Sequence, residues 1–336
     1  MNSARTIADC LAALRAQTVP AERFEVIVVD DGSTDATAEI AQDHGARVLR
    51  ITNSGPAVAR NRGVAVASGS ILVFTDADCA PDPAWLVEML APFADERVVA
   101  TKGVYRSEQR SWTARFVQAE YESRYRRMLR RETIDFVDTY AAAYRRDAFD
   151  AAGGFDESFP LPSVEDQELS FRLAAGGARM VFCPRAVVAH RHASSPLAYL
   201  RKKAKIAYWK LRVLARFPRQ ARADSHTPAS LKVELLLVAG LVVTLPLVVI
   251  PGWRWMPLGL LLGFAATIAP FCARVARKDL ALALVSPAFL FGRALALGAG
   301  TLQGMVCGQF RVTVPSRARR LPASERARAE RMTETV

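Results

Sequence analysis

Carboxylates follow two apolar, β-branched runs in the first part of the chain. Asp30 and Asp31 come directly after the run VIVV, and Asp76 and Asp78 follow the run ILVFT. Two carboxylates held together at the end of a strand can bind Mg²⁺ or Mn²⁺, which in turn can bridge a diphosphate. An isolated Asp-x-Asp is more often a solvated turn. A turn explains the adjacent Asp30 and Asp31 less well, because two neighbouring carboxylates must either reach donors on a ligand or face each other.

A further acidic pair and two histidines lie later in the chain. Glu165 and Asp166 open a predicted helix over 165–175, where the helix dipole favours acids in the first turn. Alternatively, one of these carboxylates is a general base for an acceptor hydroxyl. His190 and His192 follow the apolar run VVA. A structural histidine is the usual explanation for either, and metal ligation beside carboxylates is the functional one.

Alternating strands and helices must position these groups. Apolar patterns predict strands over 24–30, 47–51, 71–75 and 97–105, together with helices over 3–17, 35–44, 56–68 and 83–93. This alternation is typical of an α/β fold with a mostly parallel sheet, in which ligands bind beyond the carboxyl ends of the strands. Both early acidic clusters lie at such ends. A polar helix over 111–131, a strand near 136–143, a turn at Gly153-Gly154, the 165–175 helix and short strands near 179–182 and 186–190 complete a soluble domain over 1–193.

The C-terminal part has the pattern of membrane-associated helices. Residues 196–217 predict a basic amphipathic helix, typical of a membrane interface, although a core-facing helix has a similar pattern. Residues 235–253 and 255–272 carry no charge, and each approaches the roughly 20 residues needed to cross a bilayer. Cations in the next loop predict a hairpin with both ends cytosolic. Arg293 interrupts the third apolar stretch, 280–310, for which we expect an interfacial or re-entrant placement.

Composition and charge agree with this division. The chain has 336 residues, 51% of them apolar, and a mean hydropathy of +0.10, between a soluble enzyme and a polytopic transporter. Ten of its Lys and Arg residues and no acid lie within 191–222, while most of the chain is near neutral, which excludes a general nucleic-acid binder and favours an anionic membrane surface as partner. Five cysteines without a CxxC pair argue against a zinc ribbon or a redox motif. The expected segments are 1–193, an interfacial helix and linker over 194–230, a hairpin over 231–274, a third apolar segment over 275–310, and a basic solvated tail over 311–336.

From Asn2 to about His192 the chain resembles the inverting glycosyltransferases of family 2, which have the GT-A fold. The matching stretches occur in the order of that family: VIVVDDGSTDAT, GPAVARNRGVAVASG, ILVFTDADC, AAYRR, GGFDESF, EDQELSFRL and the late histidines. The ordered set is far more specific than any one stretch.

The resemblance implies a role for each cluster. The implied donor-binding residues are Asp30, Asp31, Arg60, Asp76 and Asp78. Of these, Asp30 and Asp31 are implied to contact the base and ribose of the nucleotide. Asp78 and His190 are the implied ligands of Mn²⁺ or Mg²⁺, with His192 as the alternative to His190. Asp166 is the implied catalytic base of a single displacement at the anomeric carbon, in which the metal neutralises the departing diphosphate.

The chain departs from the family pattern at two points. The family normally begins with a strand and a Pro-x-Tyr-Asn-like turn, whereas Met1-Asn2 enters at that turn. We expect either that Met1 is a misplaced start or that the sequence is truncated. Members that polymerise sugars carry Gln-x-x-Arg-Trp after the E-D helix, and the corresponding region here is YLRKKAKIAYWK. This difference favours transfer of a single sugar.

Together these patterns predict a membrane-anchored glycosyltransferase of the cytoplasmic membrane, with its catalytic domain facing the cytosol. The expected partners are a UDP, GDP or dTDP sugar and a lipid-linked or glycan acceptor. One alternative is a polyprenyl-phosphate sugar transferase, whose phosphate nucleophile needs no strong base. Another is a non-catalytic membrane scaffold with a degenerate transferase domain.

Overall fold

The computed structural model describes residues 1–309, so the predicted tail over 311–336 lies outside the described residues. The described chain divides into two compact units. Unit 1 consists of residues 1–104 and 133–190 and contains the strands. Within the described residues, unit 2 consists of residues 105–132 and 191–309 and is helical.

Unit 1 begins with a helix and a two-stranded parallel sheet. Helix α1 (Ile7–Arg15) precedes β1 (Ile27–Asp31), α2 (Thr37–Asp43), β2 (Arg47–Ile51) and α3 (Pro56–Val66). Strands β1 and β2 pair in parallel, with Asp31 opposite Ile51. Ile7 and Leu11 of α1 pack with Ala41 of α2 in one buried cluster.

A five-stranded sheet forms the rest of unit 1. Its strands are β3 (Ile71–Phe74), β4 (Cys79–Pro81), β5 (Val98–Arg106), β6 (Ala142–Arg145) and β7 (Arg179–His190), in the order β3-β6-β5-β7-β4. The pairs β3–β6, β5–β6 and β4–β7 are antiparallel. The expectation of a mostly parallel sheet is therefore confirmed only for β1 and β2. Helices α4 (Trp85–Leu90), α6 (Arg146–Ala152) and α7 (Glu165–Ala175) connect these strands.

Two strand predictions in this sheet were wrong in detail. The expected strand over 136–143 is mostly irregular, with a 3₁₀ turn at Thr139–Ala141 before β6. The chain departs from a strand around Asp138, whose carboxylate forms a buried ion pair with Lys102 of β5. The two short strands expected at 179–182 and 186–190 are one continuous strand, because Pro184 lies at an exposed position of β7. The predicted turn is present, and Gly153 and Gly154 both have positive φ.

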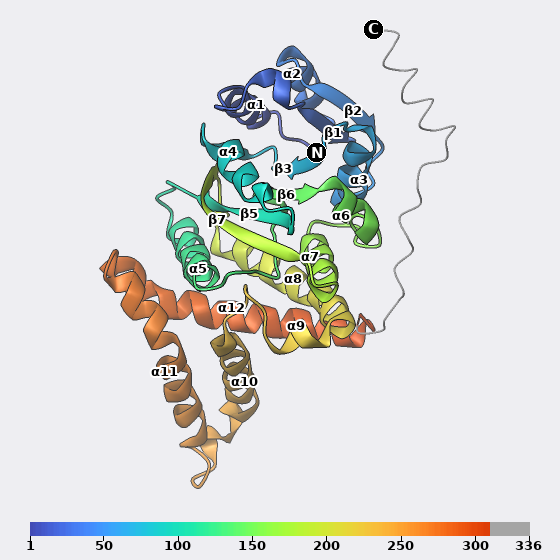
Figure 1. The fold of residues 1–336 in the computed structure, drawn as a ribbon. Coiled ribbons are helices and arrows are strands. Elements are labelled where there is room, and N and C mark those ends of the chain that lie inside the picture. The colour runs from blue at the N-terminus through green and yellow to red at the C-terminus, as the bar shows by residue number, and fades with distance from the viewer. Residues whose placement is uncertain (310–336) are drawn as a thin grey trace. The chain divides into compact units, whose positions relative to one another are not determined.

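Unit 2 packs its helices around α12 (Leu280–Val306) (Figure 1). Helix α8 (Pro196–Arg216) runs along α12, and the short α9 (Pro218–Arg222) follows it. A Cβ added at Gly300 of α12 would lie 2.0 Å from the carbonyl oxygen of Ala204, so only glycine permits this approach of the two backbones. Helix α5 (Trp112–Met128) packs on α12 through Phe116, whose ring stacks on Phe289 with centroids 4.7 Å apart.

Helices α10 (Ala229–Thr244) and α11 (Met256–Ala276) lie side by side and project from α12, joined through a 3₁₀ turn at Leu245–Val249 (Figure 1). Three helical segments are long and apolar enough to cross a membrane: Ala229–Val249, Met256–Ala276 and Leu280–Val306. By length alone α12 therefore qualifies as a span, although its sequence predicts an interfacial or re-entrant placement.

Arg293 of α12 is buried in a network of charges. Its Nη1 lies 2.6 Å from Oε1 of Glu120 on α5, and its Nη2 pairs with Glu234 on α10. Nζ of Lys203 on α8 lies 3.2 Å from Oε2 of Glu120, and the hydroxyl of Tyr199 donates to the same oxygen. The cation that interrupts the third apolar stretch thus ties four helices of unit 2 together.

Candidate active site

Strand pairing brings the Asp-x-Asp loop to the late histidine. The chain leaves β3 at Phe74, passes through Asp76 and Asp78, and enters β4. Cys79 of β4 is the direct partner of His190 in the antiparallel β4–β7 pair. This register places Nε2 of His190 3.4 Å from Oδ2 of Asp78.

The donor atoms of Asp78, Cys79 and His190 all lie within 4.8 Å of one another, close enough to hold one metal ion. A carboxylate oxygen and an imidazole nitrogen suit Mn²⁺, and the carboxylate alone suits Mg²⁺. Burial, followed by the charges of Asp76 and Asp78, raises the pKa of the Cys79 thiol far above its usual range, which leaves a neutral thiol there. Asp78 and His190 are therefore the ligands that fit a hard divalent cation, and the metal could add ligands from a bound diphosphate.

Arg60 of α3 lies between two acidic elements. Its Nη1 is 2.7 Å from Oε1 of Glu165 at the start of α7, and its Nη2 is 3.4 Å from Oδ1 of Asp76. Its guanidinium also lies over the ring of Phe155, 5.6 Å from the centroid. Arg60 thus fixes the Asp-x-Asp loop against the E-D helix, and a diphosphate that binds beside Asp76 would be within reach of the same cation.

Asp166 has the electrostatics of a proton acceptor. Its Oδ1 accepts a hydrogen bond from the backbone N–H of Gln167, 2.7 Å away. Burial, followed by the adjacent charge of Glu165, raises the pKa of the Asp166 carboxyl to about 7, against the opposing charge of Arg60. Glu165 is more buried and its two oxygens are held by Arg60 and by the N–H of Ser163. Of the pair, Asp166 is the carboxylate with a pKa near neutrality, where general bases work best.

Asp30 and Asp31 shape the loops that follow β1 and β2. The buried Asp30 accepts from the N–H of Ser33 at 3.1 Å. Asp31 accepts from the N–H groups of Ser54 and Gly55, at 2.7 and 3.0 Å. Gly55 has a φ of +92°, and an added Cβ would meet the carbonyl oxygen of Pro160 at 2.6 Å. Asp30 and Asp31 therefore stabilise the loops after β1 and β2 through hydrogen bonds to backbone N–H groups. Their contacts with a nucleotide stay predictions.

His192, the alternative to His190, is used by a different element. Its ring stacks on Tyr121 of α5, with centroids 5.5 Å apart, and its Nε2 lies 3.0 Å from Oε1 of Gln118. Its backbone N–H donates to Gln109. The histidine that lies beside Asp78 is His190, and the choice between His190 and His192 as the metal ligand stays a prediction.

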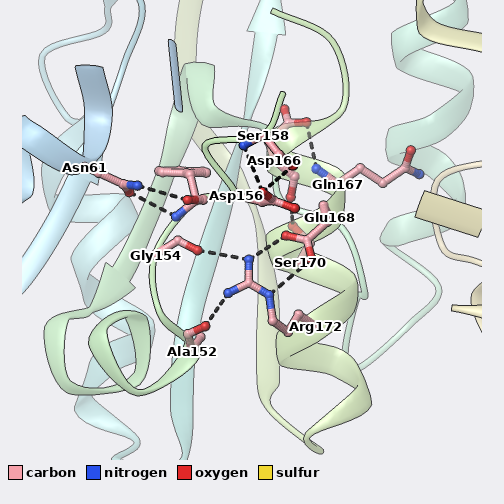
Figure 2. Close-up of polar contacts among 11 residues, drawn as sticks. Asn61, Ala152, Gly154, Asp156, Ser158, Asp166, Gln167, Glu168, Ser170 and Arg172 are labelled. Carbon is pink, nitrogen blue, oxygen red and sulfur yellow. Dashed lines mark hydrogen bonds and ion pairs between the residues drawn. The ribbon is translucent and has the colours of Figure 1, made fainter. Parts of the chain in front are cut away.

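Figure 2 shows a polar network around α7 that residue types alone did not reveal. Arg172 pairs with Glu168 one turn earlier, donates to the carbonyl of Ala152 and reaches the carbonyl of Gly154 at 3.0 Å. Asn61 of α3 exchanges hydrogen bonds with the backbone of Phe155, at 2.9 and 3.0 Å. These contacts hold the loop after α6 against α3 and α7, and so they fix the start of the E-D helix. Their sequence signal was their place inside the stretches GPAVARNRG, GGFDESF and EDQELSFRL.

The fold is shared with a solved glycosyltransferase. The structure of the mannosyltransferase PcManGT from Pyrobaculum calidifontis, in complex with GDP-Man and Mn²⁺, matches with a TM-score of 0.53 and 20% identity, over 88% of this chain and 83% of that one. At this identity the similarity establishes a GT-A-like fold.

Curated relatives match in sequence. The chain is 34% identical over 192 residues to the pre-mycofactocin glycosyltransferase of Mycobacterium tuberculosis, covering 54% of this chain and 40% of the relative. It is 42% identical over 91 residues to glycosyltransferase AglE of Haloferax volcanii, covering 25% of this chain and 30% of that protein. The chain thus spans less than half the length of these relatives. Residues 1–153 match the family described as Glycosyl transferase family 2, so the N-terminal region of the chain is similar to that family.

Proposed function

We propose that this protein is a membrane-anchored, inverting glycosyltransferase that moves one sugar from a nucleotide-diphosphate sugar to a lipid-linked or glycan acceptor at the cytosolic face of the cytoplasmic membrane. The observation that carries the proposal is the position of Asp166. This carboxylate has a pKa of about 7, raised mainly by burial, and it follows Glu165, which Arg60 ties to the Asp-x-Asp loop. Arg60 therefore connects the segment that carries the proposed base with the Asp-x-Asp loop, where we place the diphosphate.

In this proposal each residue has a distinct task. Asp166 takes the proton of the acceptor hydroxyl as that oxygen attacks the anomeric carbon. Asp78 and His190 would hold Mn²⁺ or Mg²⁺, which supplies positive charge to the departing diphosphate. Arg60 and Asp76 orient the donor diphosphate, and Asp30 and Asp31 contact the base and ribose.

A phosphate acceptor is the alternative, because a phosphate nucleophile is already ionised. The elevated pKa of Asp166 supports a hydroxyl acceptor, since a base near neutrality is useful only where a proton must be removed. Asp166→Asn separates the two. It would lower transfer to a hydroxyl by about 10²–10⁴-fold and leave transfer to polyprenyl phosphate nearly unchanged.

Membrane placement is supported by the hairpin of α10 and α11. Exposed apolar side chains, including Val243, Val249 and Leu262, cover it, and Trp253 and Trp255 lie exposed at its tip. Tryptophans of this kind concentrate at membrane–water interfaces. The basic helix α8 would lie on the anionic cytosolic surface and hold the active site near a lipid-linked acceptor.

The charge network of Arg293 favours an interfacial position for α12. Its partner Glu120 belongs to α5, a polar helix that carries Arg126 and Arg127 in its last turn. If α12 crossed the bilayer, Arg293 would lie in the hydrocarbon, and its ion pair with Glu120 would place α5 and its arginines there too. Each buried charge would then cost several kcal/mol. We therefore infer two spans, with α12 at the membrane surface.

The first test is thermal unfolding of the detergent-purified protein with UDP, GDP or dTDP, each with and without Mn²⁺. A ligand that binds the folded state raises the melting temperature. We expect one nucleotide to give a metal-dependent shift that Asp78→Ala removes and that Asp43→Ala, an exposed acid on α2, retains. Failure of all three nucleotides to shift the wild type would favour the non-catalytic scaffold.

A further inference from the structure

A cluster of cations lies where α5 faces the end of α11. It consists of Arg126 and Arg130, from the end of α5 and just beyond it, with Arg274 and Lys278, from the last turn of α11 and the turn that follows. We call these four residues the α5–α11 cation cluster. All four side chains are exposed.

Contacts across the two elements bring these cations together. Oε2 of Glu122 on α5 lies 2.8 Å from Nζ of Lys278 and 4.0 Å from Nη1 of Arg126. Arg274 lies within electrostatic range of both Arg126 and Arg130. The same crowding extends to the neighbouring Arg127, whose pKa falls to about 10, first through burial and then through repulsion by Arg124 and Arg274.

Negative charge in the cluster is insufficient to balance it. Glu122 is shared by Lys278 and Arg126, and within residues 1–309 no carboxylate forms an ion pair with Arg130 or Arg274. Folding thus gathers four cations around one acid, which costs free energy unless an anion joins them. A phosphate group is the anion that planar, bidentate guanidinium groups bind best.

The depth of the cluster identifies the source of that phosphate. Trp255 precedes α11 and Arg274 lies in its last turn, so the two are separated by about 28 Å at a rise of about 1.5 Å per residue. This distance matches the hydrocarbon thickness of a bilayer, about 30 Å. If Trp253 and Trp255 mark one interface, Arg274 lies at the headgroup level of the other.

From this coincidence of charge and depth, we propose that the α5–α11 cation cluster binds the phosphate of an anionic phospholipid headgroup. The inference rests on the membrane placement in the proposed function, and it is independent of the transfer reaction. The site would fix α5 to the bilayer surface at a defined depth, separately from the broad basic face of α8.

Thermal unfolding in neutral detergent tests the proposal, with short-chain phosphatidylglycerol, short-chain phosphatidylcholine and inorganic phosphate as probes. The variant removes three cations (Arg126→Gln, Arg130→Gln and Arg274→Gln). A charge-matched control removes three exposed arginines of unit 1 that have no place in the proposed membrane contact (Arg5→Gln, Arg23→Gln and Arg185→Gln). Because each basic residue near an anionic surface contributes about 1 kcal/mol, the cluster variant should lose on the order of 100-fold in apparent affinity for phosphatidylglycerol.

We expect phosphatidylglycerol to raise the melting temperature of the wild type and the control, and not that of the cluster variant. An equal shift in the cluster variant would overturn the proposal, as would equal shifts from phosphatidylcholine or from inorganic phosphate in the wild type. Should the triple variant fail to fold, Arg274→Gln alone must weaken the phosphatidylglycerol response about fivefold. Nucleotide-dependent shifts measured on the same preparations report the transferase proposal separately.

Discussion

Replacing the proposed base should greatly lower the rate of sugar transfer and, at alkaline pH, make the protein more stable. The pKa of Asp166 rises from its ordinary value near 3.8 to about 7 in the folded protein, chiefly through burial. A carboxyl whose pKa is raised on folding destabilises the native state as the pH increases above the unfolded value, and the full cost is reached above the folded value. Three pKa units correspond to a loss of about 4 kcal/mol in the free energy of unfolding at high pH. This value is an upper bound, because the titration of Asp166 depends on the charge of the adjacent Glu165.

Asp166→Asn removes that cost and keeps an oxygen that can accept from the N–H of Gln167. We expect the variant to melt above the wild type at pH 8, with the difference shrinking by more than half at pH 5. Catalysis should fall by about 10²–10⁴-fold, the range typical of a lost general base. In the wild type, kcat/KM should increase about tenfold per pH unit below 7 and level off above it.

The assay is thermal unfolding between pH 5 and 8, with sugar transfer measured on the same samples. Asp150→Asn, an exposed acid on α6, is the control and should change neither property. The reasoning would be refuted by a variant that is no more stable than the wild type at pH 8, or by a stability difference that does not grow with pH.

Three further substitutions test other parts of the structure. Arg293→Met leaves two buried glutamates without this partner and should destabilise unit 2 by about 3–5 kcal/mol, whereas also replacing both glutamates by glutamine should restore much of the loss in a chemical unfolding experiment. Gly300→Ala should destabilise the α8–α12 contact, because the added Cβ would meet a backbone carbonyl oxygen at 2.0 Å. Gly298→Ala has open space around its added Cβ and should be neutral or stabilising by up to about 1 kcal/mol. Equal melting temperatures for the two variants would contradict this prediction. His190→Ala should weaken Mn²⁺-dependent nucleotide binding about 10–100-fold in a titration, while His44→Ala should not, and an unchanged Mn²⁺ dependence would remove His190 from the ligand set.

Local patterns predicted local structure well. The helix over 165–175 and the apolar strand before Asp76 occur where periodicity and apolar runs indicate them, because both signals depend on neighbouring residues. The partnership of Asp78 with a late histidine was expected from the order of the motifs. The geometry of Asp78 and His190 depends on how β4 pairs with β7.

Long-range pairing accounts for what the sequence did not reveal. Strand β4 is only three residues long and has no local strand signal, and it exists because β7 offers it a partner. Glu120 is one charge among many in a polar helix, and its role emerges only when Arg293 and Lys203 arrive from α12 and α8. The expected strand over 136–143 was wrong for a similar reason, since Lys102 supplies a distant partner for Asp138.

The pairing of Cys79 with His190 also determines which length changes this domain can tolerate. Side chains alternate between the two faces of a strand, so an insertion or deletion of one residue within β7 would turn His190 to the opposite face from Asp78. Insertions in the loop before β7 leave that alternation intact. Related chains can therefore vary in their surface loops, whereas the number of residues along β7 up to the histidine has to stay constant for the two ligands to meet.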